Sequence, residues 1–498
     1  MGVNDVKSGI GNHTPDSAGQ ANDVLDSQEP SKLGRFTWPQ ITWFLVIWLA
    51  LFALGTLFVA NPFWTETAAS ANPNYGHLMY LHSVLVGLAA VVVLVACEVF
   101  GLRSTKVRTF VLAAAVGSTV LVGLGGIFDA TTQVNWVWLI LHIVGFFLLD
   151  AIFVAFLVGF YVDRRSGSKV SRGLPFWAAV LSAISLELAA LMGHAAGWLL
   201  DFGNHPALIG MWAKLMGESV SDFAGNLTTG HSHEMVAGLL ALLIAMVAWR
   251  FGYQALEGGA KVLAQIGLWF VMAGTTIMTI MYVVGGFTAI EPPTLFTFGP
   301  GGANGLASDD LVTGIGIMIG GLLVLLALWL AKKGVAVESD GLTHTLFAIA
   351  WSWLLLVVTV VGAGFYIELH ETVFGAGDPH ASGAVSDAVF TFAHQDFAFF
   401  LLPALITVLL ITSLVVRNRG RMIARGFVAG TFITFIGVLT YVFADPNAIY
   451  GPGYIVTAIG TLVVFLTVIL FLNGLRRVAF QNSHSPTPGG LVQSTKAR

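Results

Sequence analysis

The chain has 498 residues, of which 56% are apolar and 10% are charged, and its mean hydropathy is +0.82. A soluble globule needs more polar surface than this composition provides, so a soluble protein is excluded and a polytopic membrane protein is predicted. The net charge of −4 says little by itself, because the placement of Lys and Arg sets the orientation of a membrane protein.

The predicted elements are two tails and a run of apolar helices. Residues 1–36 are rich in Ser, Asp, Asn and Gly without an apolar core, so they are expected to form a disordered tail rather than a signal peptide. Residues 478–498 are expected to form a second tail. The rest of the chain contains about twelve apolar segments. Each is close in length to the roughly 20 residues that a helix needs to cross a bilayer. We expect an all-α bundle with helices at 37–60, 77–102, 109–128, 136–162, 174–201, 231–253, 262–290, 311–331, 341–367, 391–416, 426–446 and 454–475.

Lys and Arg fall almost entirely on one side of the membrane that these segments define. Of the 23 such residues, 22 lie in the tails or near alternate helix ends, and only Lys214 lies on the other side. The positive-inside rule then places both termini in the cytoplasm. We expect a multi-pass protein of a prokaryotic inner membrane, with lipid as its surroundings and no nucleic-acid partner. The one cysteine, Cys97, is expected to be a packed apolar residue.

The twelve segments divide into three blocks of four helices, at 37–162, 174–333 and 341–477. In each block a helix runs outward into a longer external loop, and the returning helix carries histidine at or near its external end. Such repetition is typical of membrane proteins built by duplication, although twelve successive helices can also show it by chance.

Ten of the 13 histidines lie on the predicted external side. Ionisable groups at membrane depth are costly and usually functional, and neutral imidazole is the form that binds metals. At 1.5 Å per residue, His82 and His142 lie about 7–9 Å inside the ends of their helices, and His194 about 10 Å inside. His233 and His394 are shallower. A layer of imidazoles on facing helices favours b-type haems, which take axial ligands from such helices.

Helical geometry limits the choice of ligands. His77 and His82 differ by about 140° around their helix, and His231 and His233 by about 200°, so neither pair can bind one metal from one face. His82 and His233, the deeper members, are favoured as axial ligands. His77 and His231 are expected near the interface, where they contact haem propionates or solvent.

Two stretches resemble the haem A synthases. LGGIFDATTQVNWVWLILH, which ends at His142, is similar to that family's third-to-fourth helix passage. Gly193 to Arg250, with GHAAGW, HPALIGMW, NLTTG and HSHEMVAGLLALLIAMVAWR, is similar to its fifth-to-sixth helix passage. The resemblance implies four-helix halves that each give two histidines to one haem, and His82 with His142 fits the first half. The expected eighth helix has no histidine, so a second haem would be held by His233 with His394.

A second resemblance is to the haem-copper oxidase and nitric oxide reductase superfamily. Proteins of that group have twelve helices in three arcs, with histidine on the second, sixth and tenth helices, and this chain resembles that plan. The segment AHQDFAFF around His394 is similar to the group's tenth-helix pattern. Gln395 and Asp396 follow His394, and the expected seventh helix has no paired histidine, so a conventional copper site is not expected. The competing hypothesis is a transporter or channel whose histidines line a proton or metal vestibule. The largely uninterrupted helices favour haem over this alternative.

Two further polar groups are candidates for function. Asp150 lies about 12 Å deeper than His142, and Glu187 about 10 Å deeper than His194, so Asp150, Glu187 and His194 form a candidate proton path. Packing against hydroxyl or carbonyl groups is the alternative reading.

The external loop IELHETVFGAGDPH places five possible metal ligands close together in sequence. Such mixed oxygen and nitrogen ligands suit Zn, Cu or Ca, although acidic external loops are commonly only solvated. The five are Glu368, His370, Glu371, Asp378 and His380.

Together these patterns predict a haem b-binding membrane oxidoreductase with one or two haems near the external face. The expected partners are quinol or a periplasmic or extracellular protein as electron donor, and other subunits that complete the ligand sets. The sequence identifies no catalytic residue.

Overall fold

The computed structural model describes residues 41, 43–46, 48, 73–131, 136–165, 173–196, 210–211, 213–215, 219–287, 305–333, 340–369, 397–416, 419–444 and 451–481. This part of the chain is helical almost throughout and contains no strand. The long helices are α4 (Pro73–Val99), α5 (Thr105–Thr131), α6 (Trp136–Arg165), α7 (Leu174–Ala196), α9 (Val220–Arg250), α10 (Gly258–Phe287), α11 (Gly305–Lys333), α12 (Asp340–Leu369), α14 (Leu402–Val415), α15 (Gly420–Ala444) and α16 (Pro452–Gln481).

The structure confirms an all-α multi-pass membrane protein. Ten helical segments among the described residues are long and apolar enough to cross a membrane, and α4 adds a shorter apolar stretch at Val84–Val99. The helix expected at 37–60 and the two tails lie largely outside the described residues. The count of about twelve and the location of the termini therefore stay predictions.

Several helix ends differ from those that hydropathy predicts. Helix α9 begins at Val220 rather than at residue 231, because a helix satisfies its own backbone hydrogen bonds and can continue beyond its apolar part. The tenth expected helix is described only from Phe397, and it opens with π-helical residues before α14 begins at Leu402. Pro403 stands in the first turn of α14, where its missing N–H group costs least.

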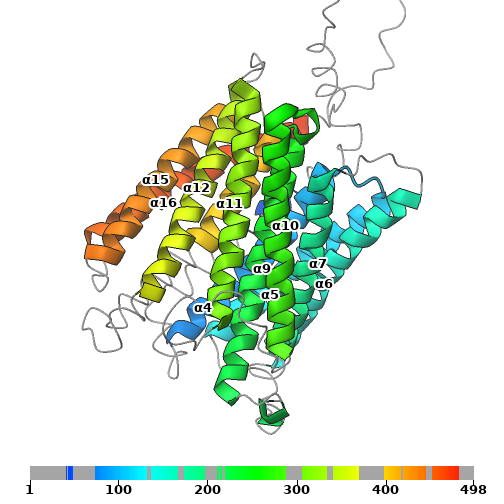
Figure 1. The fold of residues 1–498 in the computed structure, drawn as a ribbon, viewed down its shortest axis with the longest axis vertical. Helices are drawn as coiled ribbons and strands as arrows, with labels where there is room; N and C mark the ends of the chain where they lie inside the picture. Colours follow the sequence, from blue (N-terminus) through cyan, green and yellow to red (C-terminus); the bar gives the residue numbers. More distant parts are fainter. Residues whose placement is uncertain are drawn as a thin grey trace, which may run out of the picture.

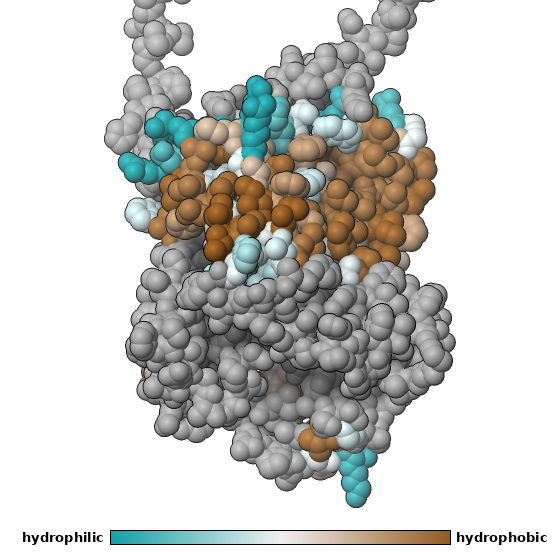
Figure 2. Space-filling view, turned by 90° about the vertical axis from the view of Figure 1, so that its left-hand side faces the viewer, coloured by the Kyte–Doolittle hydropathy of each residue, from teal (hydrophilic) through white to brown (hydrophobic). Residues whose placement is uncertain are grey.

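Apolar side chains cover the outside of the bundle as well as its interior. Phe147 on α6 and Leu462, Phe465 and Leu466 on α16 are about half exposed or more. Figure 2 shows a hydrophobic band with hydrophilic residues gathered beyond one edge of it. This is the surface that a bilayer requires, because lipid tails solvate apolar side chains as well as a protein core does.

Helix α9 occupies the centre of the bundle. It contacts α7, α10, α11, α4 and α14, and its residues from Leu239 to Ala248 are fully buried or nearly so. Figure 1 shows α9 beside α7 and α10. The helices α4, α9 and α14 all contact one another. These three correspond to the second helix of each expected four-helix block.

The third and fourth helices of each expected block form a close pair. The pairs are α5 with α6, α10 with α11, and α15 with α16, and they make the most extensive helix contacts in the described part of the bundle. The same arrangement therefore occurs three times along the chain, although the division into blocks stays a prediction.

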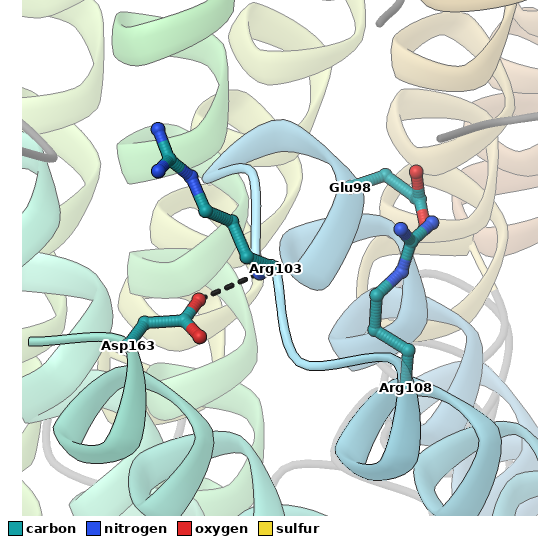
Figure 3. Close-up of polar contacts among 4 residues, drawn as sticks. All are labelled: Glu98, Arg103, Arg108 and Asp163. Carbon is teal, nitrogen blue, oxygen red and sulfur yellow. Dashed lines mark hydrogen bonds and ion pairs between the residues drawn. The ribbon is translucent and has the colours of Figure 1, made fainter. Parts of the chain in front are cut away.

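We call the end of the bundle that holds the turns after α4, α9 and α14 the basic end, and the opposite end the histidine end. At the basic end, the backbone N–H of Arg103 donates a hydrogen bond to Asp163 Oδ2 at 2.6 Å, which joins the α4–α5 turn to α6 (Figure 3). Arg108 on α5 forms an ion pair with Glu98 on α4. Arg250 hydrogen-bonds Ser413 and thereby joins α9 to α14.

Candidate functional site

The structure brings together two of the three residues expected in a proton path. His194 near the end of α7 and Asp150 in the middle of α6 share a hydrogen bond of 2.6 Å between Nε2 and Oδ2. Glu187, two turns before His194 on α7, lies near enough to interact electrostatically with both. A histidine and a carboxylate therefore pair between α6 and α7, inside the candidate membrane spans, with a second carboxylate nearby on α7.

His142 lies beside this cluster. Its side chain is 1% exposed, and its ring packs against Phe146 with centroids 4.4 Å apart. The Phe146 ring also meets the His194 ring edge-on at 5.7 Å, and Phe147 stacks on His194 at 5.0 Å. The two imidazoles are thus held by one aromatic patch on α6.

His231 extends the cluster from α9, although it was expected near the interface in contact with solvent or propionates. Its Nδ1 instead lies 2.6 Å from the carbonyl oxygen of Ala189 on α7. The ring also lies so close to Gly193 that a side chain there would overlap it. This packing explains a glycine directly before His194, because α7 and α9 approach closely at that point.

His233 faces a different part of the bundle, as the 200° separation from His231 requires. Its ring stacks on Tyr282 of α10 at 6.1 Å and meets Phe399, just before α14, at 6.4 Å. His233 therefore faces the segment that begins at Phe397, three residues after His394 in sequence.

Glu234 is a buried ionisable group to which the sequence argument gave no role. Its side chain has no exposure and lies beside Thr279 of α10, whose hydroxyl donates to Ser185 Oγ at 3.0 Å. A fully buried carboxyl in a membrane helix is expensive and points to function. The signal was present in the sequence, since Glu234 is the one acidic residue in the apolar span Gly230–Arg250.

The other candidate residues cannot be placed. His77 and His82 belong to α4, but their side chains lie outside the described residues, as does that of Glu368 at the end of α12. The remaining candidates also fall outside the described ranges: His370, Glu371, Asp378, His380 and His394. At the level of helices, α4 contacts α6, and α9 contacts α14.

The described residues include imidazoles of the kind that a haem takes as axial ligands. In the described ranges no three His, Cys, Asp or Glu side chains converge on a point that could hold a metal. A porphyrin supplies four ligands itself and needs only one or two imidazoles from the protein. His142 and His233 are imidazoles inside membrane helices that could each supply one.

Comparisons with protein-family models, with curated proteins and with solved structures give no match to this chain. The resemblances to haem A synthases and to the haem-copper superfamily therefore stay predictions carried by the residues quoted above.

Proposed function

We propose that the chain is a haem b-binding oxidoreductase of the membrane, with haem at the histidine end of the bundle. The observation that carries the proposal is the central contact among α4, α9 and α14. Two of these helices bear the expected ligands His82 and His233, and the third, α14, begins at Leu402, after His394 in sequence. Both resemblances agree on haem, and neither names the reaction.

One haem would be held by His82 and His142, and a second by His233 and His394. Bound haem would supply one-electron redox chemistry. The chain's own groups would handle the accompanying proton: Asp150 of the His194–Asp150 pair lies on the same helix as His142, and Glu187 lies two turns before His194 on α7. A proton taken up there would offset the charge of an added electron, which is costly in a low-dielectric interior.

The electron donor would be quinol or a protein on the histidine side, in a prokaryotic inner membrane with the basic end in the cytoplasm. A haem held near one face of the bilayer would lie close to donors on that face and in the surrounding lipid, which suits either donor.

The proposal is tested by the absorption spectrum of the detergent-purified full chain and of two histidine variants. We expect His142→Ala to lose about one haem per chain or to change the spectrum of one haem. His344→Ala, at the basic end on α12, is the matched control and should keep the wild-type spectrum. Equal haem content in His142→Ala and wild type would remove His142 from the ligand set.

A second candidate is a proton transporter lined by histidine and carboxylate. The 2.6 Å pair between His194 and Asp150, with Glu187 nearby, is the observation that favours it. Proton uptake into proteoliposomes distinguishes the transporter from the haem oxidoreductase. The proteoliposomes contain haem-free protein and a pH-sensitive dye that reports the uptake. Proton uptake that Asp150→Asn abolishes would support transport, and absence of uptake would exclude it.

A further inference from the structure

A groove opens between α11, α12 and α15 at the basic end, the opposite end of the bundle from His142 and His233. It encloses a volume of about 550 Å³ and its lining is almost entirely apolar. Two aromatic pairs form its walls: Trp329 with Phe347 at 6.1 Å, and Trp351 with Phe432 at 6.1 Å. The small side chains of α15 between them leave the space open.

The groove is polar at one end only. His344 and Arg425 line it near the first turns of α12 and α15, at the basic end. Trp351 and Phe432 follow these residues by seven positions each, so they lie about 10 Å deeper on the same helix faces. Phe347 and Phe432 are 46% and 49% exposed, so the groove opens toward the lipid. Its occupant must therefore have a polar head at the membrane boundary and an apolar body along the aromatic walls.

The charge of the head follows from the side chains around it. Arg425 is exposed, and it forms no ion pair with any carboxylate whose side chain the structure describes. The hydroxyl of Thr343, another lining residue, is buried and has no hydrogen-bond partner among the described residues. A guanidinium binds phosphate through two parallel hydrogen bonds, and a hydroxyl can add a third. Basic pockets between membrane helices on the positively charged side are suited to anionic lipid head groups.

We propose that this groove binds an anionic phospholipid. Its phosphate contacts Arg425, with His344 and Thr343 beside it, and one acyl chain lies between the two aromatic pairs. The lipid site is independent of haem. None of its residues is an expected haem ligand or a member of the candidate proton path.

Native mass spectrometry of the detergent-purified full chain tests the proposal, with phosphatidylglycerol and phosphatidylcholine of identical acyl chains as probes. We expect one phosphatidylglycerol to be retained more tightly than phosphatidylcholine. Arg425→Gln should weaken phosphatidylglycerol binding about tenfold, the loss expected for one charge-assisted contact. Arg477→Gln, which removes the same charge from an exposed position on α16, is the matched control and should leave binding unchanged.

Ala429→Trp provides a second variant that does not remove charge. Ala429 lines the groove and is exposed, so a larger side chain fills the space without entering the core, and it should reduce retention of both lipids. Equal binding of the two lipids, or an equal loss in Arg425→Gln and Arg477→Gln, would overturn the proposal. Retention of a neutral quinone analogue that is sensitive to Ala429→Trp but not to Arg425→Gln would identify a quinone site instead.

Discussion

Two ionisable side chains inside the membrane segments satisfy one another: His194 on α7 and Asp150 on α6. A buried polar group left without its partner costs about 1–3 kcal/mol. We therefore expect Asp150→Ala to lower the thermal stability of the detergent-purified protein, because it leaves the imidazole without an acceptor. Asp150→Asn keeps an acceptor oxygen and should cost less. Equal melting temperatures for the alanine variant and the wild type would show that the pair contributes nothing to stability.

Gly193 gives a second prediction for a single residue. A methyl group at this position would overlap the His231 ring and displace it from the carbonyl oxygen of Ala189. We expect Gly193→Ala to cost about 1–3 kcal/mol, the usual range for overpacking. Gly314→Ala on α11 is the control, because a methyl group there meets nothing within 4 Å. The two variants are compared by thermal unfolding, and an equal effect would contradict the close approach of α7 and α9.

The sequence could identify these residues but not their partners. Counting residues along a helix gives depth, and depth alone marked Asp150, Glu187 and His194 as candidates. The partner of a side chain depends on which helices are neighbours and on how each helix is rotated about its axis. A membrane helix has apolar residues on all its faces, so its sequence does not determine that rotation. For example, the sequence could not predict the contact between His231 and the carbonyl oxygen of Ala189, because Ala189 belongs to another helix.

At the scale of helices, glycines spaced by seven residues bring α15 and α16 together. A Cβ at Gly430 or Gly437 of α15, or at Gly453 or Gly460 of α16, would meet the backbone of the partner helix. Small residues let membrane helices approach closely, and dispersion forces between them then provide much of the stability. The sequence predicted both helices from hydropathy, but the pairing depends on this shared face, which hydropathy does not report.

Gly437→Leu should separate this helix pair. Its Cβ would lie within 2.8 Å of Thr457 Cα, and backbone cannot move aside as a flexible side chain can. We expect a loss of about 1–3 kcal/mol in stability, read as a lower melting temperature. Gly362→Leu on α12 introduces the same side chain where nothing lies within 4 Å, and it should unfold like the wild type. A normal melting temperature for Gly437→Leu would contradict the close crossing.

The ion pair between Glu98 and Arg108 joins α4 to α5 at the basic end (Figure 3). Both side chains are mostly buried, so removing one partner leaves an uncompensated charge and costs about 3–5 kcal/mol. Glu98→Gln and Arg108→Gln should therefore each destabilise the protein. The double variant should lose less stability than the sum of the two single losses. A double-mutant cycle measured by thermal unfolding checks this coupling, and additive effects would show that the two side chains act independently.

At the scale of the whole molecule, one arrangement recurs along the chain. The second helices of the expected blocks, α4, α9 and α14, meet in the centre, and the third and fourth helices of each block pair closely around them. The sequence predicted the class of fold, because composition and hydropathy suffice for that. It could not predict the central contact, since that depends on which apolar faces meet. The described histidines that become neighbours, His142, His194 and His231, lie on α6, α7 and α9.

The haem content of the purified chain tests the central claim most directly. The measurement is a reduced-minus-oxidised spectrum with a pyridine haemochrome assay, on full-length protein expressed with ample haem and purified in detergent. The histidine-bearing helices at the centre of the bundle predict a b-type spectrum with one or two haems per chain. A colourless protein from haem-replete cells would contradict the account and make the histidine-lined transporter the leading explanation.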